Sequence, residues 1–404
     1  MNKKLFKLIT MIILLAYTLT FLGCQKTETK NDLQTTFNEE MIEANQKFAI
    51  NIFKTLQVEE KGKDIFISPF SISTALTMAL KGAKGETLEE MRQVLELNDI
   101  SESDINDYYK GVLDNLNNYK GDVELAIKNS VWIKEGENIK QEFIDNMETI
   151  FDSYVNELDF SKSESVETIN SWIEEATNEK IKDMLKPPIS PDVIMYLINA
   201  IYFNGDWKYE FDEDKTFEAE FVSETGDTTK VNMMNSKMNI DYYKEDRFQA
   251  IRLPYKEKDL SMLVFLPQEG IEIGDFISNF NLEVLSKTLT NLEIFEELIV
   301  QIPKFKIEYG TKLLNNPLIS LGMELPFSAQ ADFSKIREGL MISRVMHKSF
   351  IEVNEQGSEA AAATIVELQE TAALEPEIFR ADRPFVFLIY DKNSSTILFI
   401  GKNS

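Results

Sequence analysis

The segment FIEVNEQGSEAAAATIVELQE, residues 350–370, joins a strand-like run to a stretch of small side chains. Four consecutive alanines favour a helix there, because alanine has the highest helix propensity. The stretch nevertheless starts at Gly357, contains no lysine or arginine and runs into the turn-like LEPE of residues 374–377, ahead of a strongly apolar C-terminus. Local sequence therefore allows either a surface helix or an extended strand.

As an extended strand, the segment has two unlike faces, because successive side chains point to opposite sides of a strand. One face carries only small or apolar side chains: Ser358, Ala360, Ala362, Thr364, Val366 and Leu368. The other face is half polar: Glu359, Ala361, Ala363, Ile365, Glu367 and Gln369. The first face can be buried without leaving a charge unpaired. Gly357 supplies backbone freedom where the segment begins.

Composition limits the partners of the whole chain. Its 404 residues are 43% hydrophobic and 11% aromatic, enough for a substantial core. With 68 acidic against 42 basic residues, the formal net charge is -26. Such a body repels nucleic acid and anionic membrane surfaces, so we expect no nucleic-acid partner and a soluble monomeric domain.

The N-terminus predicts export and a lipid anchor. Lysines at positions 3, 4 and 7 precede an apolar run, Leu8 to Leu22, which is too short for a comfortable membrane span and suits a signal peptide. The run ends at Gly23 and Cys24, a pattern similar to the bacterial lipoprotein signal. We expect removal of residues 1–23, lipidation of Cys24 and a flexible tether over residues 24–40 on the bacterial cell surface. A signal cut elsewhere and an uncleaved anchor are the alternatives.

The body, residues 41–404, reads as one α+β domain. Helical periodicity starts near Met41, continues as two helices across residues 68–95 with a glycine break, and returns over residues 164–185. Strand-like runs dominate later, over residues 193–203, 248–255, 260–267, 298–309, 350–355, 385–391 and 395–401. Helices first and strands later favour a single domain with large sheets. Because Cys24 is the only cysteine, this body cannot hold a disulfide.

The sequence contains few candidate residues for enzyme catalysis. His347 is the only histidine, and no Gly-x-Ser-x-Gly turn accompanies it, so a catalytic triad is not indicated. A zinc site needs a cluster of histidines and cysteines, and a phosphate loop needs a glycine-rich turn between a strand and a helix; neither occurs. We therefore expect no catalytic residues, no metal and no cofactor.

Seven motifs, in order from about residue 41 to the C-terminus, resemble those of the serpins. They are FISPFSISTALTMALKGAKGET (66–87), NAIYFNGDW (199–207), LPYKEKDLSMLVFLP (253–267), IPKFKIE (302–308), LGMELPFSAQADFSKI (321–336), VMHKSFIEVNEQGSEAAAAT (345–364) and ADRPFVFLIYDKNSSTILFIG (381–401). The resemblance implies a large central mixed sheet, two further sheets, eight or nine helices and an exposed reactive loop over about residues 355–379. Glu179 departs from the family, which commonly has glycine there.

For the opening segment, the resemblance implies the hinge and first half of a reactive loop. In inhibitory serpins a target protease cuts this loop, and the loop then enters the main sheet as a new strand while still bound to the protease. About fifteen residues at ~3.3 Å each would move the protease by roughly 50 Å. The hinge residues are Glu355, Gly357, Ser358, Glu359, Ala360, Ala361, Ala362, Ala363 and Thr364.

Counted from Glu355 as is usual in the family, the resemblance implies a cut between Thr371 and Ala372, with Glu370, Ala372, Ala373 and Leu374 as alternative residues before the cut. No lysine or arginine lies between Lys348 and Arg380, which excludes trypsin-like targets. A small residue at the cut suits elastase-like or subtilisin-like serine proteases. A cut at Glu370 would indicate a glutamate-specific protease, and papain-like cysteine proteases remain open.

The resemblance also implies two groups of supporting residues. Ser68, Ser71, Asn199 and His347 match the buried polar shutter beneath the strands that part, and Trp207, Lys304 and Glu355 match the breach where insertion begins. Ordinary core packing and strand-end hydrogen bonding are alternative roles. Three other functions remain for the whole chain: a carrier built on the same scaffold, a hydrolase that depends on His347, and an inhibitor so slow to insert that it behaves as a substrate.

Overall fold

The computed structural model describes residues 37–117, 119, 123–257, 259–358 and 376–404. The chain divides into two units, Met1–Thr36 and Phe37–Ser404, and the fold described below is that of the second unit. Its first helix begins at Glu39, two residues before the predicted start of the body. In the part of the chain that the structure describes, no helix combines the length and apolar character needed to cross a membrane.

Nine α-helices form within the described residues, and most of them precede the long antiparallel sheet region. Asn38 caps the first by accepting hydrogen bonds from the amides of Glu40 and Met41, and Ser68 caps the second. The helices are α2 (Glu39–Glu59), α3 (Pro69–Leu80), α4 (Gly85–Val94), α5 (Glu102–Asn117), α6 (Gln141–Phe151), α7 (Ser163–Ala176), α8 (Ile273–Asn279), α9 (Leu282–Asn291) and α10 (Asn315–Ser320).

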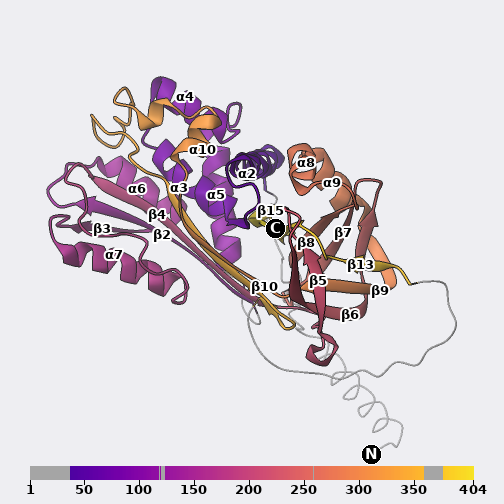
Figure 1. The fold of residues 1–404 in the computed structure, drawn as a ribbon. Helices are drawn as coiled ribbons and strands as arrows, with labels where there is room; N and C mark the ends of the chain where they lie inside the picture. The colour runs from indigo at the N-terminus through magenta and orange to yellow at the C-terminus, as the bar shows by residue number, and fades with distance from the viewer. Residues whose placement is uncertain (1–36, 118, 120–122, 258, 359–375) are drawn as a thin grey trace, which may run out of the picture. The chain divides into compact units, whose positions relative to one another are not determined.

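The largest sheet has the order β1-β15-β14-β8-β7-β6-β9-β13, with β5 paired to β6 (Figure 1). It is mixed, because β13 runs parallel to β9 while the other pairs are antiparallel. Its strands are β1 (Ile65–Ile67), β5 (Phe217–Val222), β6 (Thr228–Lys244), β7 (Phe248–Pro254), β8 (Leu260–Pro267), β9 (Glu293–Pro303), β13 (Ile378–Arg380), β14 (Phe385–Asp391) and β15 (Thr396–Asn403). Strands β8 and β14 are buried along their whole length, which explains their uninterrupted apolar sequences.

Two further sheets contain the loop hinge. One has the order β12-β4-β2-β3 and the other is the pair β10-β11. The strands are β2 (Val123–Lys134), β3 (Ser153–Leu158), β4 (Met195–Asp206), β10 (Phe305–Leu313), β11 (Met346–Val353) and β12 (Gly357–Ser358). The expected α+β fold, with one large mixed sheet, two further sheets and eight or nine helices, is thus confirmed, and the described residues form nine helices.

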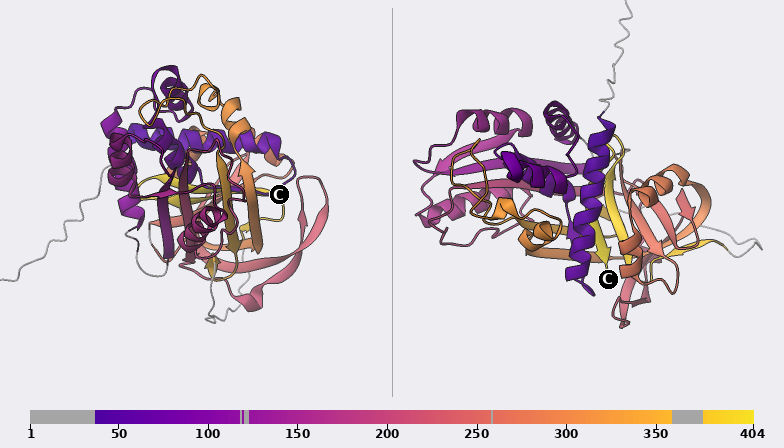
Figure 2. Two further views of the ribbon diagram at one scale, coloured as in Figure 1. Left: turned by 90° about the vertical axis from the view of Figure 1, so that its left-hand side faces the viewer. Right: turned by 90° about the horizontal axis from the view of Figure 1, so that it is seen from above.

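Most buried side chains belong to one apolar core. In this core α2 packs against β15 and α3, as the two views of Figure 2 show. A second, smaller cluster lies beneath α7. Strand β4 separates the two: Leu197 and Ile201 face the main core, whereas Tyr196 and Ile198 face the cluster under α7. The two faces of β4 therefore have defined environments.

Two sequence predictions of secondary structure are wrong. The helix predicted over residues 164–185 ends at Ala176, because Asn178 and Glu179 adopt positive φ angles of 48° and 61°. Glu179, noted above as a substitution for glycine, thus occupies backbone that glycine adopts more readily. The run predicted as one strand over 298–309 is two strands, β9 and β10, which break at Lys304 and lie in different sheets.

Candidate functional site at the loop hinge

The chain reverses direction immediately after β11. The side-chain oxygen of Asn354 accepts hydrogen bonds from the amides of Gln356 (3.0 Å) and Gly357 (3.2 Å) and so closes the turn. The next two residues, β12, pair antiparallel with β4, with Gly357 opposite Asp206 and Ser358 opposite Gly205. The start of the predicted reactive loop is therefore already a sheet strand in this structure.

Glycine is required at position 357 by the closeness of the neighbouring strand. A Cβ atom on this residue would lie 2.2 Å from the carbonyl oxygen of Gly205 and 2.6 Å from Cα of Asp206. Both contacts are with backbone, which cannot move aside as a flexible side chain can. Any other residue at position 357 would push β12 away from β4.

Trp207 holds the turn from the end of β4. Its indole Nε1 donates to the carbonyl of Asn354 (3.0 Å), and its backbone amide donates to the carbonyl of Gln356 (2.7 Å). The indole stacks on Tyr255 with ring centroids 4.6 Å apart. Trp207 thus joins the hinge turn to the largest sheet, with which Tyr255 is contiguous.

Glu355 and Lys304, both matched to the breach from the sequence, form an ion pair. Lys304 Nζ lies 2.7 Å from one carboxylate oxygen of Glu355, and the Thr216 hydroxyl donates to the other at 2.7 Å. Only 4% of the Glu355 side chain is exposed. Burial by itself would raise the pKa of Glu355, but the Lys304 ammonium and the Thr216 hydroxyl outweigh it and hold the pKa below its ordinary value.

A cavity of about 790 Å³ separates β4 from β11 beyond the hinge. Its lining includes the core-facing side chains of Leu197 and Ile201 from β4, His347 from β11, and Ile72 and Leu76 from α3. Among the described residues β4 pairs on this edge only with β12, and β11 pairs only with β10. Over this length β4 and β11 flank a space that one further strand could occupy.

Buried polar groups lie at the base of this space. The Ser68 amide donates to Nε2 of His347 (3.1 Å), and the Ser68 hydroxyl donates to the carbonyl of Leu398 (2.7 Å). The Ser71 amide donates to the Ser68 hydroxyl at 3.2 Å. Since Nε2 of His347 accepts a hydrogen bond, the imidazole is neutral, and burial lowers its pKa to about 4.

Asn199 lies on the other side of the space. Its amide nitrogen donates to Asn129 Oδ1 (2.7 Å) in β2, and its backbone carbonyl accepts from the Ser71 hydroxyl at 3.5 Å. Its side-chain oxygen is buried without a hydrogen-bond partner among the described residues. The four predicted shutter residues therefore fall into two halves, Ser68 with His347 and Asn199 with Asn129, joined weakly through Ser71.

Three participants were missed from the sequence. Asn354 carries a recognisable signal, because an asparagine shortly before a glycine favours this kind of turn. Thr216 and Asn129 carry none, since each reaches its partner only through the tertiary fold. Of the predicted site residues, those outside the described residues are Cys24, Glu359, Ala360, Ala361, Ala362, Ala363, Thr364, Thr371 and Ala372.

Comparison with known proteins adds an independent line of evidence. The family model described as "Serpin (serine protease inhibitor)" matches residues 43–404. A serpin-like protein of Methanosarcina acetivorans is 37% identical over 369 residues, covering 89% of this chain and 86% of the relative. The leukocyte elastase inhibitor of Sus scrofa is 34% identical over 379 residues, covering 91% and 99%.

Solved structures agree with these sequence matches. Native tengpin, a thermophilic serpin, superposes with a TM-score of 0.82 at 32% identity, covering 91% of this chain and 94% of tengpin. Human thyroxine-binding globulin superposes with a TM-score of 0.80 at 30% identity, covering 90% of this chain and 97% of the globulin. The similarity therefore extends over the whole body.

Proposed function

The chain belongs to the serpin family, and on that premise we propose that it is a suicide-type protease inhibitor whose reactive bond is Thr371–Ala372. The serine hydroxyl of the protease attacks the carbonyl carbon of Thr371, and the bond to the nitrogen of Ala372 breaks. The new amine takes a proton and leaves, while Thr371 stays on the protease as an ester. Loop insertion then carries the ester, with the protease attached, away from the cut before water can hydrolyse it.

The register of β12 on β4 is the observation that carries this proposal. Antiparallel pairing of Gly357 with Asp206 and Ser358 with Gly205, continued residue by residue, brings Ala362 opposite Ile201 and Thr364 opposite Asn199. Ile201 faces the main core, so the small, uncharged face of the segment would be the buried one. Glu359 and Glu367 would point the other way.

The free edges of β4 and β11 also support insertion of the loop between these two strands. Strands β4 and β11 offer their free edges to the cavity, and the hinge turn already directs the chain between them. A further strand would gain hydrogen bonds on both edges and would bury apolar surface against Ile72 and Leu76. Insertion is therefore favourable once cleavage frees one end of the loop.

The sequence around the cut favours elastase-like or subtilisin-like targets, because no basic residue lies between Lys348 and Arg380. The relative named leukocyte elastase inhibitor supports this class. A papain-like cysteine protease, whose specificity depends on the residue before Thr371, is the alternative target from another protease class. The target itself and the inhibitory role are part of the proposal.

The test incubates the soluble body with an elastase-like and a subtilisin-like protease, followed by denaturing gels and sequencing of the released C-terminal fragment. We expect a band at the summed mass that survives boiling, and a fragment that starts at Ala372. Cleavage without such a band across a broad protease panel would overturn the proposal.

A carrier is the second candidate, because thyroxine-binding globulin is among the similar structures. This candidate predicts loop cleavage without a boil-stable complex, together with saturable binding of a small hydrophobic ligand by the intact body. The same gel therefore distinguishes an inhibitor from a carrier. Saturable binding in a ligand titration would then support the carrier.

We also propose that residues 1–23 are removed and that a lipid on Cys24 holds the inhibitor at the bacterial cell surface, as the N-terminal pattern indicates. The full chain expressed in a bacterium should partition into the detergent phase and carry an added lipid mass at Cys24. Cys24→Ala should move it to the aqueous phase. Equal partitioning of the two proteins would contradict the lipid anchor.

A further inference from the structure

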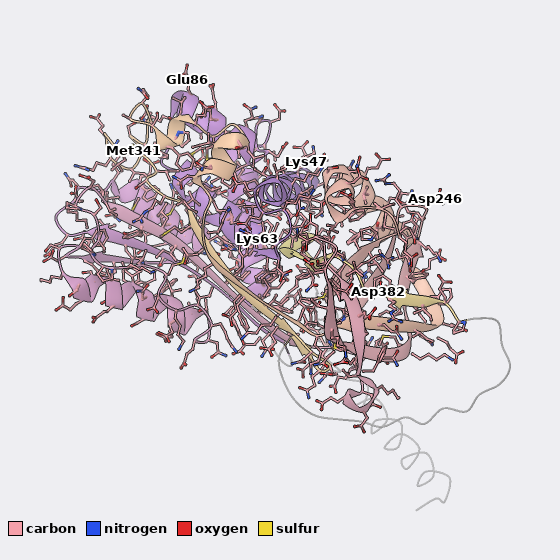
Figure 3. The ribbon with its side chains drawn as sticks, in the orientation of Figure 1. Lys47, Lys63, Glu86, Asp246, Met341 and Asp382 are labelled. Carbon is pink, nitrogen blue, oxygen red and sulfur yellow. The ribbon has the colours of Figure 1, made fainter. Side chains whose placement is uncertain are left out.

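The cavity between β4 and β11 extends beyond the shutter residues to the start of both strands. Met195 opens β4 and Met346 opens β11, and both line this end of the cavity. Met184, from the segment between α7 and β4, and Met341, from the loop before β11, add to the apolar lining (Met341 is labelled in Figure 3). Flexible methionine side chains adapt to ligands of variable shape. We call this end, lined by Met184, Met195, Met341 and Met346, the far site.

The lining of the cavity carries positive charge, although the protein as a whole is acidic. Arg337, Arg344 and Lys348 line it, and Asp192 is the only acidic side chain among the described residues of the lining. Arg337 already pairs with the carboxylate of Glu137 at 3.3 Å, and Lys348 donates to a backbone carbonyl at 2.8 Å. The cavity therefore favours an anion in a chain with 68 acidic against 42 basic residues.

Arg344 is the cation best placed to bind a ligand. It is exposed, and no carboxylate forms an ion pair with it among the residues that the structure describes. Its guanidinium donates a hydrogen bond to the hydroxyl of Tyr196, the residue after Met195 on β4. Burial raises the pKa of Tyr196, so this hydroxyl keeps its own proton and can donate it. Arg344 and Tyr196 thus offer two kinds of donor to one anion at the mouth of the far site.

The size and polarity of the cavity select the class of ligand. Its volume of about 790 Å³ lies within the range of roughly 300–1,000 Å³ that small-molecule sites occupy. A fatty-acid anion fits, because its carboxylate needs the donors of Arg344 and Tyr196 and its chain needs the apolar methionines. A sugar or a nucleotide would place polar groups among the methionines without partners, and a cationic amphiphile would be repelled by Arg344.

We infer that the far site binds the anion of a saturated fatty acid and that the bound chain competes with the reactive loop. In the register of β12 on β4, Leu368 would lie opposite Met195, so the last part of the inserted strand needs the far site. A bound fatty acid therefore delays the completion of insertion, and water can hydrolyse the ester before the protease is displaced. The site itself does not depend on the proposed function, whereas the competition rests on it.

Calorimetric titration of the intact soluble body with laurate, below the concentration at which laurate forms micelles, tests the site. Decanoate, shorter by two CH₂ groups, should bind roughly 15-fold more weakly, because each buried CH₂ contributes about fourfold in affinity. Arg344→Gln should weaken laurate binding about tenfold by removing the charged donor. Arg247→Gln removes another exposed arginine, which lies outside the cavity, and should leave the affinity unchanged. Melting temperatures equal to that of the wild type establish that both variants fold.

Dodecyltrimethylammonium, which has a chain of the same length and the opposite charge, is the control ligand. We expect it to bind at least about tenfold more weakly than laurate. Equal laurate affinity of the wild type and Arg344→Gln, an equal loss in Arg247→Gln, or equally tight binding of dodecyltrimethylammonium would each overturn the site.

Competition with the loop is measured on denaturing gels with an elastase-like protease. The fraction of converted body that is trapped should fall as laurate saturates the site, with half of the effect at the dissociation constant found by calorimetry. In Arg344→Gln the same laurate concentration should leave the trapped fraction close to its value without laurate, which excludes an effect of laurate on the protease. A trapped fraction in the wild type that laurate does not change would overturn the competition. Laurate binding without any trapped product, even in the absence of laurate, would refute the inhibitor and still support the site.

Discussion

At the scale of single residues, the ion pair between Glu355 and Lys304 gives the hinge a defined pH dependence. The pKa of Glu355 is lower in the folded protein than its ordinary value of 4.5, so folding favours the charged form. The resulting stability is fully present above about pH 4.5 and is lost as the pH falls through the depressed pKa.

We therefore expect Glu355→Gln to lower the free energy of unfolding at pH 7 by about 1–3 kcal/mol. The difference between the thermal midpoints of the wild type and the variant should shrink as the pH falls below about 4.5 and through the depressed pKa. Glu352→Gln, which removes the same charge from β11, is the control. A difference between wild type and Glu355→Gln that does not shrink with falling pH would refute this account of the pair.

His347 provides a second residue-scale prediction. Its pKa falls from 6.5 to about 4 on folding, because the ring is buried and burial disfavours the charged form. The neutral ring accepts a hydrogen bond from the Ser68 amide. The unfolded chain then binds a proton that the folded chain does not, so stability decreases as the pH falls from 6.5 to 4. The total loss is roughly 3 kcal/mol. His347→Gln keeps an acceptor for Ser68 and should flatten this slope in thermal melts, whereas an identical slope would contradict it.

The sequence motifs identified the residues of the hinge and the shutter, but they did not predict all of the contacts between those residues. The motifs placed Lys304 near Glu355 and Ser68 near His347, and both pairs meet. Asn199 and His347, predicted within one network, share no hydrogen bond among the described residues, because the strands that carry them lie on opposite sides of the cavity. A strand separation of this kind depends on tertiary packing and leaves no local signal.

At the scale of elements, the direction in which the loop enters follows from β12. If the register continues, a carboxylate on the core side of the new strand would be buried without a partner, which costs several kcal/mol. The double variant Glu359→Ala/Ala360→Glu moves one carboxylate from the outer to the core face and leaves the net charge unchanged. We expect it to be cleaved but to form no boil-stable complex.

Glu359→Ala alone is the matched control and should trap protease as the wild type does. The ratio of trapped to cleaved product on denaturing gels is the measurement. Equal ratios for the double variant and its control would show that the face opposite Phe203 and Gly205 is not the buried one.

Element boundaries show where periodicity fails as a predictor. Strand β8 coincides with its predicted run because it is buried on both faces. Strands β2, β3, β5 and β6 were not predicted, since their long polar stretches do not form continuous apolar runs. In β12 only Gly357 and Ser358 are paired, and glycine is depleted in strands, so propensity does not predict this strand. Their pairing depends on β4 and Trp207.

At the scale of the whole molecule, the described residues leave one strand position open between β4 and β11, and β12 pairs with β4 at one end of that position. The fold class was predictable because seven motifs in order define the family. The open strand position between β4 and β11 could not be predicted from the sequence, because it depends on how these two strands pack on α3. A net charge of -26 also belongs to this scale and makes acidic partners unfavourable.

Insertion of residues 359–368 between β4 and β11 is the central claim, and amide hydrogen exchange after loop cleavage tests it most directly. The body is cut at the loop by a protease, and exchange is followed by mass spectrometry in the cut and intact forms. We predict that peptides from residues 359–368, β4 and β11 all become strongly protected on cleavage, and that the melting temperature rises. Unchanged protection in residues 359–368 after cleavage would contradict insertion and, with it, the proposed mechanism.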